Sequence, residues 1–216
     1  MILQNIERHF VSHSSYIDYN KAINISDLQK IIEVQKNNNK KEIEIEKIKF
    51  PSESIFKFPY FTYHYFTKND YCFDNKVNKT KLNKNFFSPN INELLFYNTD
   101  LVSLEENNDT FLCKKLNDVL NLVSKKLLEK GIKLIVLPSP DKYDFYYENI
   151  VNKSIYPNPL FFFNMSRMEK NYIFLDSKEI LRREIDKIKD IYFYDDTHWT
   201  PKASKLIAEE IEKNIK

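Results

Sequence analysis

The second half of the chain alternates between a helical and an extended pattern of apolar residues. Between residues 111 and 130, apolar side chains recur at the three- and four-residue spacing of one helix face: Leu112, Leu116, Val119, Leu120, Val123, Leu127 and Leu128. Gly131 is well placed to end this helix, because glycine readily adopts the left-handed conformation that follows a helix C-terminus. The next run, Lys133–Leu137, is short and apolar, which predicts a buried strand.

The same alternation continues toward the C-terminus. Residues 171–175 and 191–194 are predicted as two further strands, residues 177–188 as the helix between them, and Pro201 as the start of a last helix. Strands that alternate with helices are typical of an α/β fold with a mainly parallel sheet flanked by helices. We therefore predict such a domain over residues 91–216, with any ligand bound at the carboxyl ends of its strands.

The first 90 residues have a different character, and we predict a separate α+β N-terminal extension of unclear role. Residues 26–34 suggest a helix, and the alternating Glu and Ile residues of 42–50 suggest a half-exposed strand. Residues 55–66 are dense in aromatic side chains. These could form a stacking platform for sugars or bases, or the packed face of strands.

Composition narrows the possible functions. The chain of 216 residues is long enough for one sizeable domain, and its 33 basic residues nearly balance its 31 acidic ones. The lysines are scattered, so nucleic acid is a poor candidate partner. No run of apolar residues is long enough to span a bilayer. Charged residues interrupt the first ten positions, so the sequence predicts no signal peptide, and the location of the protein stays unknown.

The chain has few of the cysteine and glycine residues that bind metal ions or cofactors. The two cysteines, Cys72 and Cys113, are too few and too far apart for a metal cage, and we expect both to be free thiols. The single glycine, Gly131, excludes a glycine-rich phosphate loop and a Gly-Asp-Ser nucleophile turn. We expect no cofactor.

The most reactive combination of residues follows the third predicted strand. Asp196 and His198 are two residues apart, so in an extended segment their side chains point the same way, as a general base and its orienting carboxylate require. A metal site at Asp195, Asp196 and His198 is disfavoured, because three ligands within four residues rarely surround one ion. In the simplest structural interpretation, the two aspartates only cap the last helix and His198 only packs.

Three segments resemble a known family in order and approximate spacing. Residues 93–97, 133–143 and 196–201 are similar to the first half of the SGNH-hydrolase-like domain of the alginate O-acetylation proteins AlgX and AlgJ, over about residues 91–212. The resemblance implies an SGNH or flavodoxin-like fold, and the transfer or hydrolysis of O-acetyl groups on exported polysaccharides. It implies a carbohydrate acceptor, an acyl donor and a periplasmic or cell-envelope location.

The resemblance also implies roles for particular residues. His198 would be the general base and Asp196 its partner, while Asp195 is an alternative partner, since related enzymes use an Asp-x-x-His pattern. Lys142 and Trp199 are candidates for substrate binding, although Lys142 could be a solvated strand end and Trp199 could pack beneath the motif.

The nucleophile is the part of the family pattern that the sequence lacks. Family members carry the serine in a strand-to-helix turn well after the His-Trp motif, whereas this chain ends at Lys216. Ser139, on the loop after a predicted strand, is the first substitute, although its two flanking prolines favour a structural role. A shortened or inactive relative is one expectation. The alternative is a noncatalytic carbohydrate-binding or assembly protein that uses the same edge of the sheet.

Overall fold

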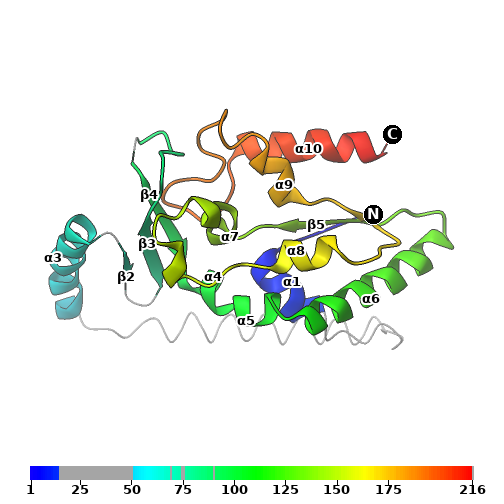
Figure 1. Ribbon diagram of the computed structural model, residues 1–216, viewed down its shortest axis with the longest axis horizontal. Helices are drawn as coiled ribbons and strands as arrows, with labels where there is room; N and C mark the ends of the chain where they lie inside the picture. The colour runs from blue at the N-terminus through cyan, green and yellow to red at the C-terminus, as the bar shows by residue number, and fades with distance from the viewer. Residues whose placement is uncertain (15–50, 69, 74–75, 90, 216) are drawn as a thin grey trace. The chain divides into compact units, whose positions relative to one another are not determined.

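The computed structural model describes residues 1–14, 51–68, 70–73, 76–89 and 91–215 (Figure 1). The chain divides into two compact units, residues 18–68 and the remainder. The boundary predicted near residue 90 is therefore not where the units divide, because the first residues of the chain belong to the larger unit. The helix predicted at 26–34 and the strand predicted at 42–50 lie outside the described residues.

A parallel sheet forms the centre of the larger unit, in the order β1-β5-β6. Strand β1 (Ile2–Ile6) runs beside β5 (Ile135–Ser139), with Ile6 opposite Ser139, and β5 pairs with β6 (Ile173–Phe174). The predicted α/β fold with a parallel sheet is confirmed. The strand predicted at 171–175 is present but shorter, and β1 was not predicted.

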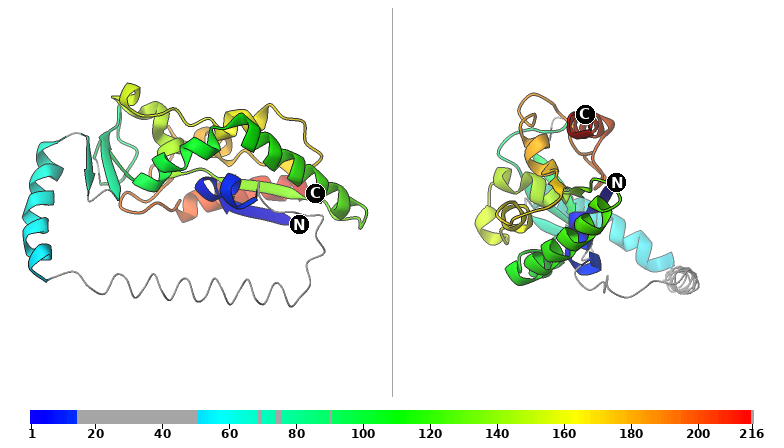
Figure 2. Two further views of the ribbon diagram at one scale, coloured as in Figure 1. Left: turned by 90° about the horizontal axis from the view of Figure 1, so that it is seen from below. Right: turned by 90° about the vertical axis from the view of Figure 1, so that its right-hand side faces the viewer.

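Helices cover both faces of this sheet. On one face, α1 (Glu7–Ser14), α6 (Thr110–Leu128) and α8 (Phe161–Ser166) pack against β5 (Figures 1 and 2). Their shared core includes Phe10, Val11, Leu116, Leu120, Val136, Phe161 and Met165. The Asp109 side chain caps α6 by accepting hydrogen bonds from two backbone N–H groups, and Gly131 follows with a φ of 72°.

The opposite face of β5 contributes to a second core. Because side chains alternate along a strand, Ile135 and Leu137 face away from Val136. They pack in one cluster with Leu181 of α9 (Ser177–Arg182) and Ile207 of α10 (Pro201–Ile215). Asp176 caps α9, and the remainder of the helix predicted at 177–188 is a series of turns.

The same core extends to a small antiparallel sheet in the order β2-β3-β4. Its strands are Tyr71–Phe73, Val77–Lys81 and Glu93–Tyr97. The short helices α4 (Asn98–Val102) and α5 (Leu104–Asn107) follow β4, whereas α7 (Lys142–Tyr146) and the 3₁₀ turns η1 (Tyr147–Asn149) and η2 (Lys153–Ile155) follow β5.

One strand prediction was wrong. Residues 191–194 form a loop in which only Tyr192 makes a β-bridge, to Trp199. The carbonyl groups of Phe193 and Tyr194, which a strand ladder would use, accept hydrogen bonds from the Lys142 ammonium instead. The segment therefore continues no sheet.

The aromatic segment is helix α3 (Pro51–Thr67) of the smaller unit. Aromatic residues favour strands, but this segment lacks the strict alternation of a strand. Phe61 and Tyr65, one helical turn apart, are half-buried, whereas Phe58 and Phe66 are exposed. The aromatic residues thus lie around a helix and do not form the packed face of strands, one of the two arrangements considered from the sequence.

Candidate functional site

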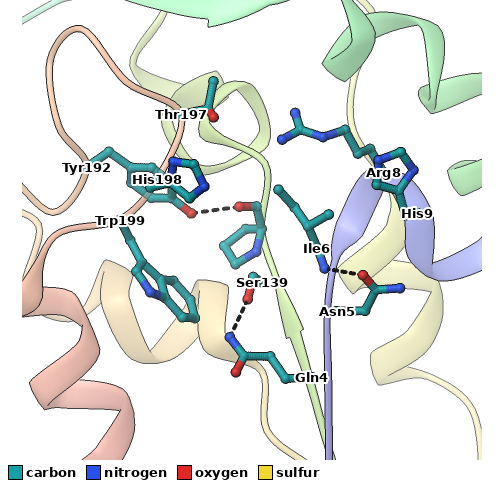
Figure 3. Close-up of a pocket in the computed structure, with 11 residues that line it drawn as sticks. Gln4, Asn5, Ile6, Arg8, His9, Ser139, Tyr192, Thr197, His198 and Trp199 are labelled. Atoms are coloured by element: carbon teal, nitrogen blue, oxygen red, sulfur yellow. Dashed lines mark hydrogen bonds between the residues drawn. The ribbon is translucent and has the colours of Figure 1, made fainter. Parts of the chain in front are cut away.

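A cavity of about 460 Å³ lies at the carboxyl end of the parallel sheet, where ligands of α/β proteins bind. Three segments line it: the junction of β1 and α1, the end of β5 and the loop that precedes α10. Figure 3 shows His198 and Thr197 on one side of this cavity and Arg8 and His9 on the other.

Asp196 and His198 form a hydrogen-bonded pair beside this cavity. One oxygen of Asp196, Oδ1, lies 2.6 Å from His198 Nδ1 and also accepts a 2.9 Å hydrogen bond from the His198 backbone N–H. These two hydrogen bonds hold the pKa of the Asp196 carboxyl below its usual range. The carboxylate thus fixes the orientation of the imidazole ring, and Nε2 is left for a ligand.

Asp195 does not take the partner position in this arrangement. In the described part of the chain, the side-chain contact to the His198 ring comes from Asp196. Asp195 instead lines a second cavity of about 340 Å³, together with Asp196 and the exposed ring of Tyr97. The two cavities share Arg8, Thr197 and His198, so His198 is accessible from both.

Lys142 is buried below the loop that carries this pair. Only 1% of the residue is exposed, and its ammonium donates to the backbone carbonyls of Phe193, Tyr194 and Asp196 at 2.7, 2.7 and 3.1 Å. Burial lowers the pKa of Lys142 to about 7, although nearby carboxylates act in the opposite direction. This environment does not match the solvated strand end considered from the sequence, and Lys142 lines neither cavity.

Ser139 and Trp199 both line the larger cavity. The Ser139 hydroxyl accepts a 3.2 Å hydrogen bond from the amide of Gln4 on β1, and in Figure 3 it points toward Gln4 and away from His198. Trp199 is half-buried and packs against the core shared by α9 and α10, so one part of its ring supports the loop while another faces the cavity.

Sequence reasoning missed the contribution of the β1–α1 junction. Arg8 lines both cavities and pairs with two buried carboxylates, Asp100 and Asp141, the second at 3.2 Å. Glu7 is fully buried and accepts a 3.0 Å hydrogen bond from the Asp141 backbone N–H. No distinct sequence pattern marks this junction, because the polar residues Gln4 and Asn5 interrupt the apolar ones before Glu7 and Arg8.

Burial dominates the electrostatics of this charged cluster. Desolvation raises the pKa of Glu7 and Asp141 well above their usual ranges, and nearby carboxylates add to the effect. The pKa of Asp100 rises to about 6 by burial, although Arg8 favours its charged form. The cluster also contains Asp144, which pairs with Lys178 of α9.

A metal site and a cysteine nucleophile find little support among the described residues. None of them form a group of three or more His, Cys, Asp or Glu side chains able to hold a metal ion. Cys113 is a free, buried thiol with a pKa raised to about 11 by burial, so it is a poor nucleophile at neutral pH. None of the described helices is both long and apolar enough to cross a membrane.

Comparison with known proteins identifies the family. Residues 93–216 match the model of the SGNH hydrolase-like domain of the acetyltransferase AlgX. No curated protein and no solved structure matches the chain. The match begins with β4 and includes Lys142 and the Asp196–His198 pair, whereas β1 and Arg8 lie outside it. Because the match covers more than half of the chain, this protein belongs to the AlgX family of SGNH hydrolase-like acetyltransferase domains.

Proposed function

We propose that the protein transfers or hydrolyses O-acetyl groups on carbohydrate hydroxyls, with His198 as the general base. The observation that carries the proposal is the 2.6 Å contact of His198 Nδ1 with Asp196 beside a cavity at the carboxyl edge of the sheet. This geometry suits acyl transfer because a hydroxyl becomes a good nucleophile only when a base removes its proton.

The proposed reaction requires one proton to move twice. Nε2 of His198 takes the proton of an attacking hydroxyl while that oxygen bonds to the acyl carbon. Asp196 stabilises the resulting imidazolium. The tetrahedral intermediate then collapses, the bond from the acyl carbon to the leaving oxygen breaks, and His198 returns the proton to that oxygen.

The attacking hydroxyl can come from three sources: Ser139, the acceptor or water. Ser139 shares the cavity with His198 but is hydrogen-bonded to Gln4, so it would have to rotate before attack. The acceptor hydroxyl itself, or water, can also be deprotonated directly by His198. The exposure of His198, 78% of its side chain, supports attack by a group that enters from solvent.

The experiment combines ester hydrolysis with serine labelling. We expect the full chain to hydrolyse p-nitrophenyl acetate, and His198→Ala to lose about 10²- to 10⁴-fold of the rate. A fluorophosphonate probe followed by peptide mapping then identifies any activated serine, with Ser139→Ala as the matched control. A label that depends on both residues assigns the nucleophile to Ser139. Hydrolysis without a label assigns the attack to water or to the acceptor.

A noncatalytic carbohydrate-binding role is the second candidate. The hydrogen bond between Ser139 and Gln4 favours it, because this serine lines the cavity but is not aimed at His198. This role predicts that oligosaccharides bind equally well to the wild type and to His198→Ala, and that neither protein hydrolyses the ester. Loss of hydrolysis in the His198 variant would exclude it.

A further inference from the structure

Lys142 donates three hydrogen bonds to the backbone of the loop that carries the Asp196–His198 pair. The segment from Phe193 to His198 folds back on itself, and its ends are tied by hydrogen bonds from Phe193 N to His198 O at 3.2 Å and from Thr200 N to Ile191 O at 2.9 Å. Between these ties, three backbone carbonyls converge on one ammonium group. The loop therefore encloses a buried cation from a different element, α7.

A lysine suits this position for a chemical reason. Its ammonium has three N–H donors and no acceptor, so it can satisfy three carbonyls at once. The ammonium also lies 5.2 Å from the centre of the Phe87 ring, a favourable distance for a cation over an aromatic face. Asp195 and Asp196 on the loop and Asp100 on α4 are the carboxylates that favour its charged form. Together these contacts offset part of the cost of burial.

One of the three hydrogen bonds reaches the Asp196–His198 pair directly. Lys142 binds the carbonyl of Asp196, whose side chain in turn receives both hydrogen bonds from His198. Fixing this carbonyl fixes the backbone from which the carboxylate extends. We propose that Lys142 is a positioning residue, which orients the Asp196–His198 pair by binding the backbone of residues 193–196 and does not contact substrate.

The role of Lys142 in catalysis rests on the proposed function, but its role in holding the loop does not. The test therefore begins with amide hydrogen exchange followed by NMR. Lys142→Met removes the donors at similar length, and Lys170→Met is the matched control, because Lys170 also donates to backbone carbonyls, those of Met165 and Met168, in another part of the chain. We expect Lys142→Met to accelerate exchange of the His198 and Thr200 amides at least about tenfold, with β5 amides unchanged.

A kinetic measurement separates positioning from general stability. Lys142→Met should lower kcat for ester hydrolysis with little change in KM, and Lys142→Arg, which keeps charge and donors, should restore part of both kcat and amide protection. Unchanged exchange in Lys142→Met would overturn the inference. If the wild type has no activity but the exchange result holds, the proposed function fails while the loop-holding role stands.

A spectrum of the wild type covers the case in which Lys142→Met does not fold. A buried, hydrogen-bonded ammonium exchanges its protons slowly with water, so the Lys142 group should give a resolved NH₃⁺ signal in ¹H–¹⁵N spectra near pH 6. Assignment is through Lys142→Arg, which should lack the signal. Absence of such a signal from the wild type would contradict the proposed contacts.

Discussion

Two charged regions of this protein meet at Arg8 but differ in exposure. The Asp196–His198 pair lies in solvent, with 53% and 78% of the side chains exposed, whereas Glu7, Asp100 and Asp141 are at most 3% exposed. The pKa of Asp196 is lowered by its hydrogen bonds, while burial raises the pKa of the three carboxyl groups below. Exposed charge can react with a substrate, and buried charge fixes the backbone around it.

The largest expected effect distinguishes the two adjacent aspartates. Asp196→Asn should lower kcat for ester hydrolysis about 10²- to 10⁴-fold, because the imidazole loses its orienting carboxylate. Asp195→Asn is the matched control and should stay within about threefold of the wild type, since it makes no described contact with the ring. Steady-state kinetics on p-nitrophenyl acetate measures both variants. A larger loss in Asp195→Asn than in Asp196→Asn would show that the Asp-x-x-His alternative holds in solution.

The second prediction concerns the loss of the Arg8 cation from the buried cluster. Arg8→Met should lower the free energy of unfolding by about 3–5 kcal/mol at pH 7.5, because it leaves Asp100 and Asp141 buried without their cation. The cost should shrink as the pH falls toward about 6, because Asp100 takes up its proton at a higher pH once Arg8 is removed, and it should change little below that value. Urea unfolding of the wild type and of Arg8→Met, at pH 7.5 and at about pH 6, measures how the cost changes with pH. A surface control, Lys114→Met, removes only an exposed pair and should change stability by less than about 1 kcal/mol.

The third prediction follows from the raised pKa of Glu7. The folded protein retains a proton on this group at pH values where the unfolded chain has released it, so its contribution to stability falls as pH rises from about 4.5 through the folded pKa. Glu7→Gln removes this dependence and keeps an acceptor for the Asp141 N–H. The variant should be more stable than the wild type at pH 8 by about 1 kcal/mol and should lose that advantage at pH 4.

Thermal melts of the wild type and of Glu7→Gln between pH 4 and pH 8 test this prediction. A variant that is equally stabilised at both pH values would indicate a packing effect, and one that is destabilised at pH 8 would show that Glu7 is needed in its charged form.

The smallest effect is expected where function is proposed. His198→Ala should change the free energy of unfolding by no more than about 0.5 kcal/mol, because the side chain is largely in solvent. Denaturant unfolding of this variant alongside the wild type measures it. A loss above about 2 kcal/mol would show that the imidazole supports the loop, and the contrast between the two charged regions would fail.

The sequence predicted the parts of the fold that have local signals. The apolar spacing of α6, its end at Gly131 and the short apolar run of β5 all lie within one continuous segment. The Asp196–His198 contact was also expected, although the expectation assumed an extended segment and the structure forms the contact within a series of bends. In these cases a few neighbouring residues determine the local conformation.

Parts that depend on distant partners were not predictable. Strand β1 is recognised only by its pairing with β5, and its five residues carry no distinct pattern. The loop at 191–194 has the composition of a strand, but Lys142 binds its carbonyls. Arg8 enters the site for the same reason, since α1 follows directly from β1. Single-sequence patterns do not encode such long-range contacts.

The pairing of Ile2 with Ile135 also has a kinetic consequence. As the chain leaves the ribosome, β1 emerges before β5 and must wait until β5 has been synthesised before their parallel pairing can form. Contacts between residues so far apart in sequence close large loops and slow folding. During that interval the apolar side chains of β1 and α1 lack their native partners, so folding during synthesis should depend on chaperones more than the size of the domain suggests.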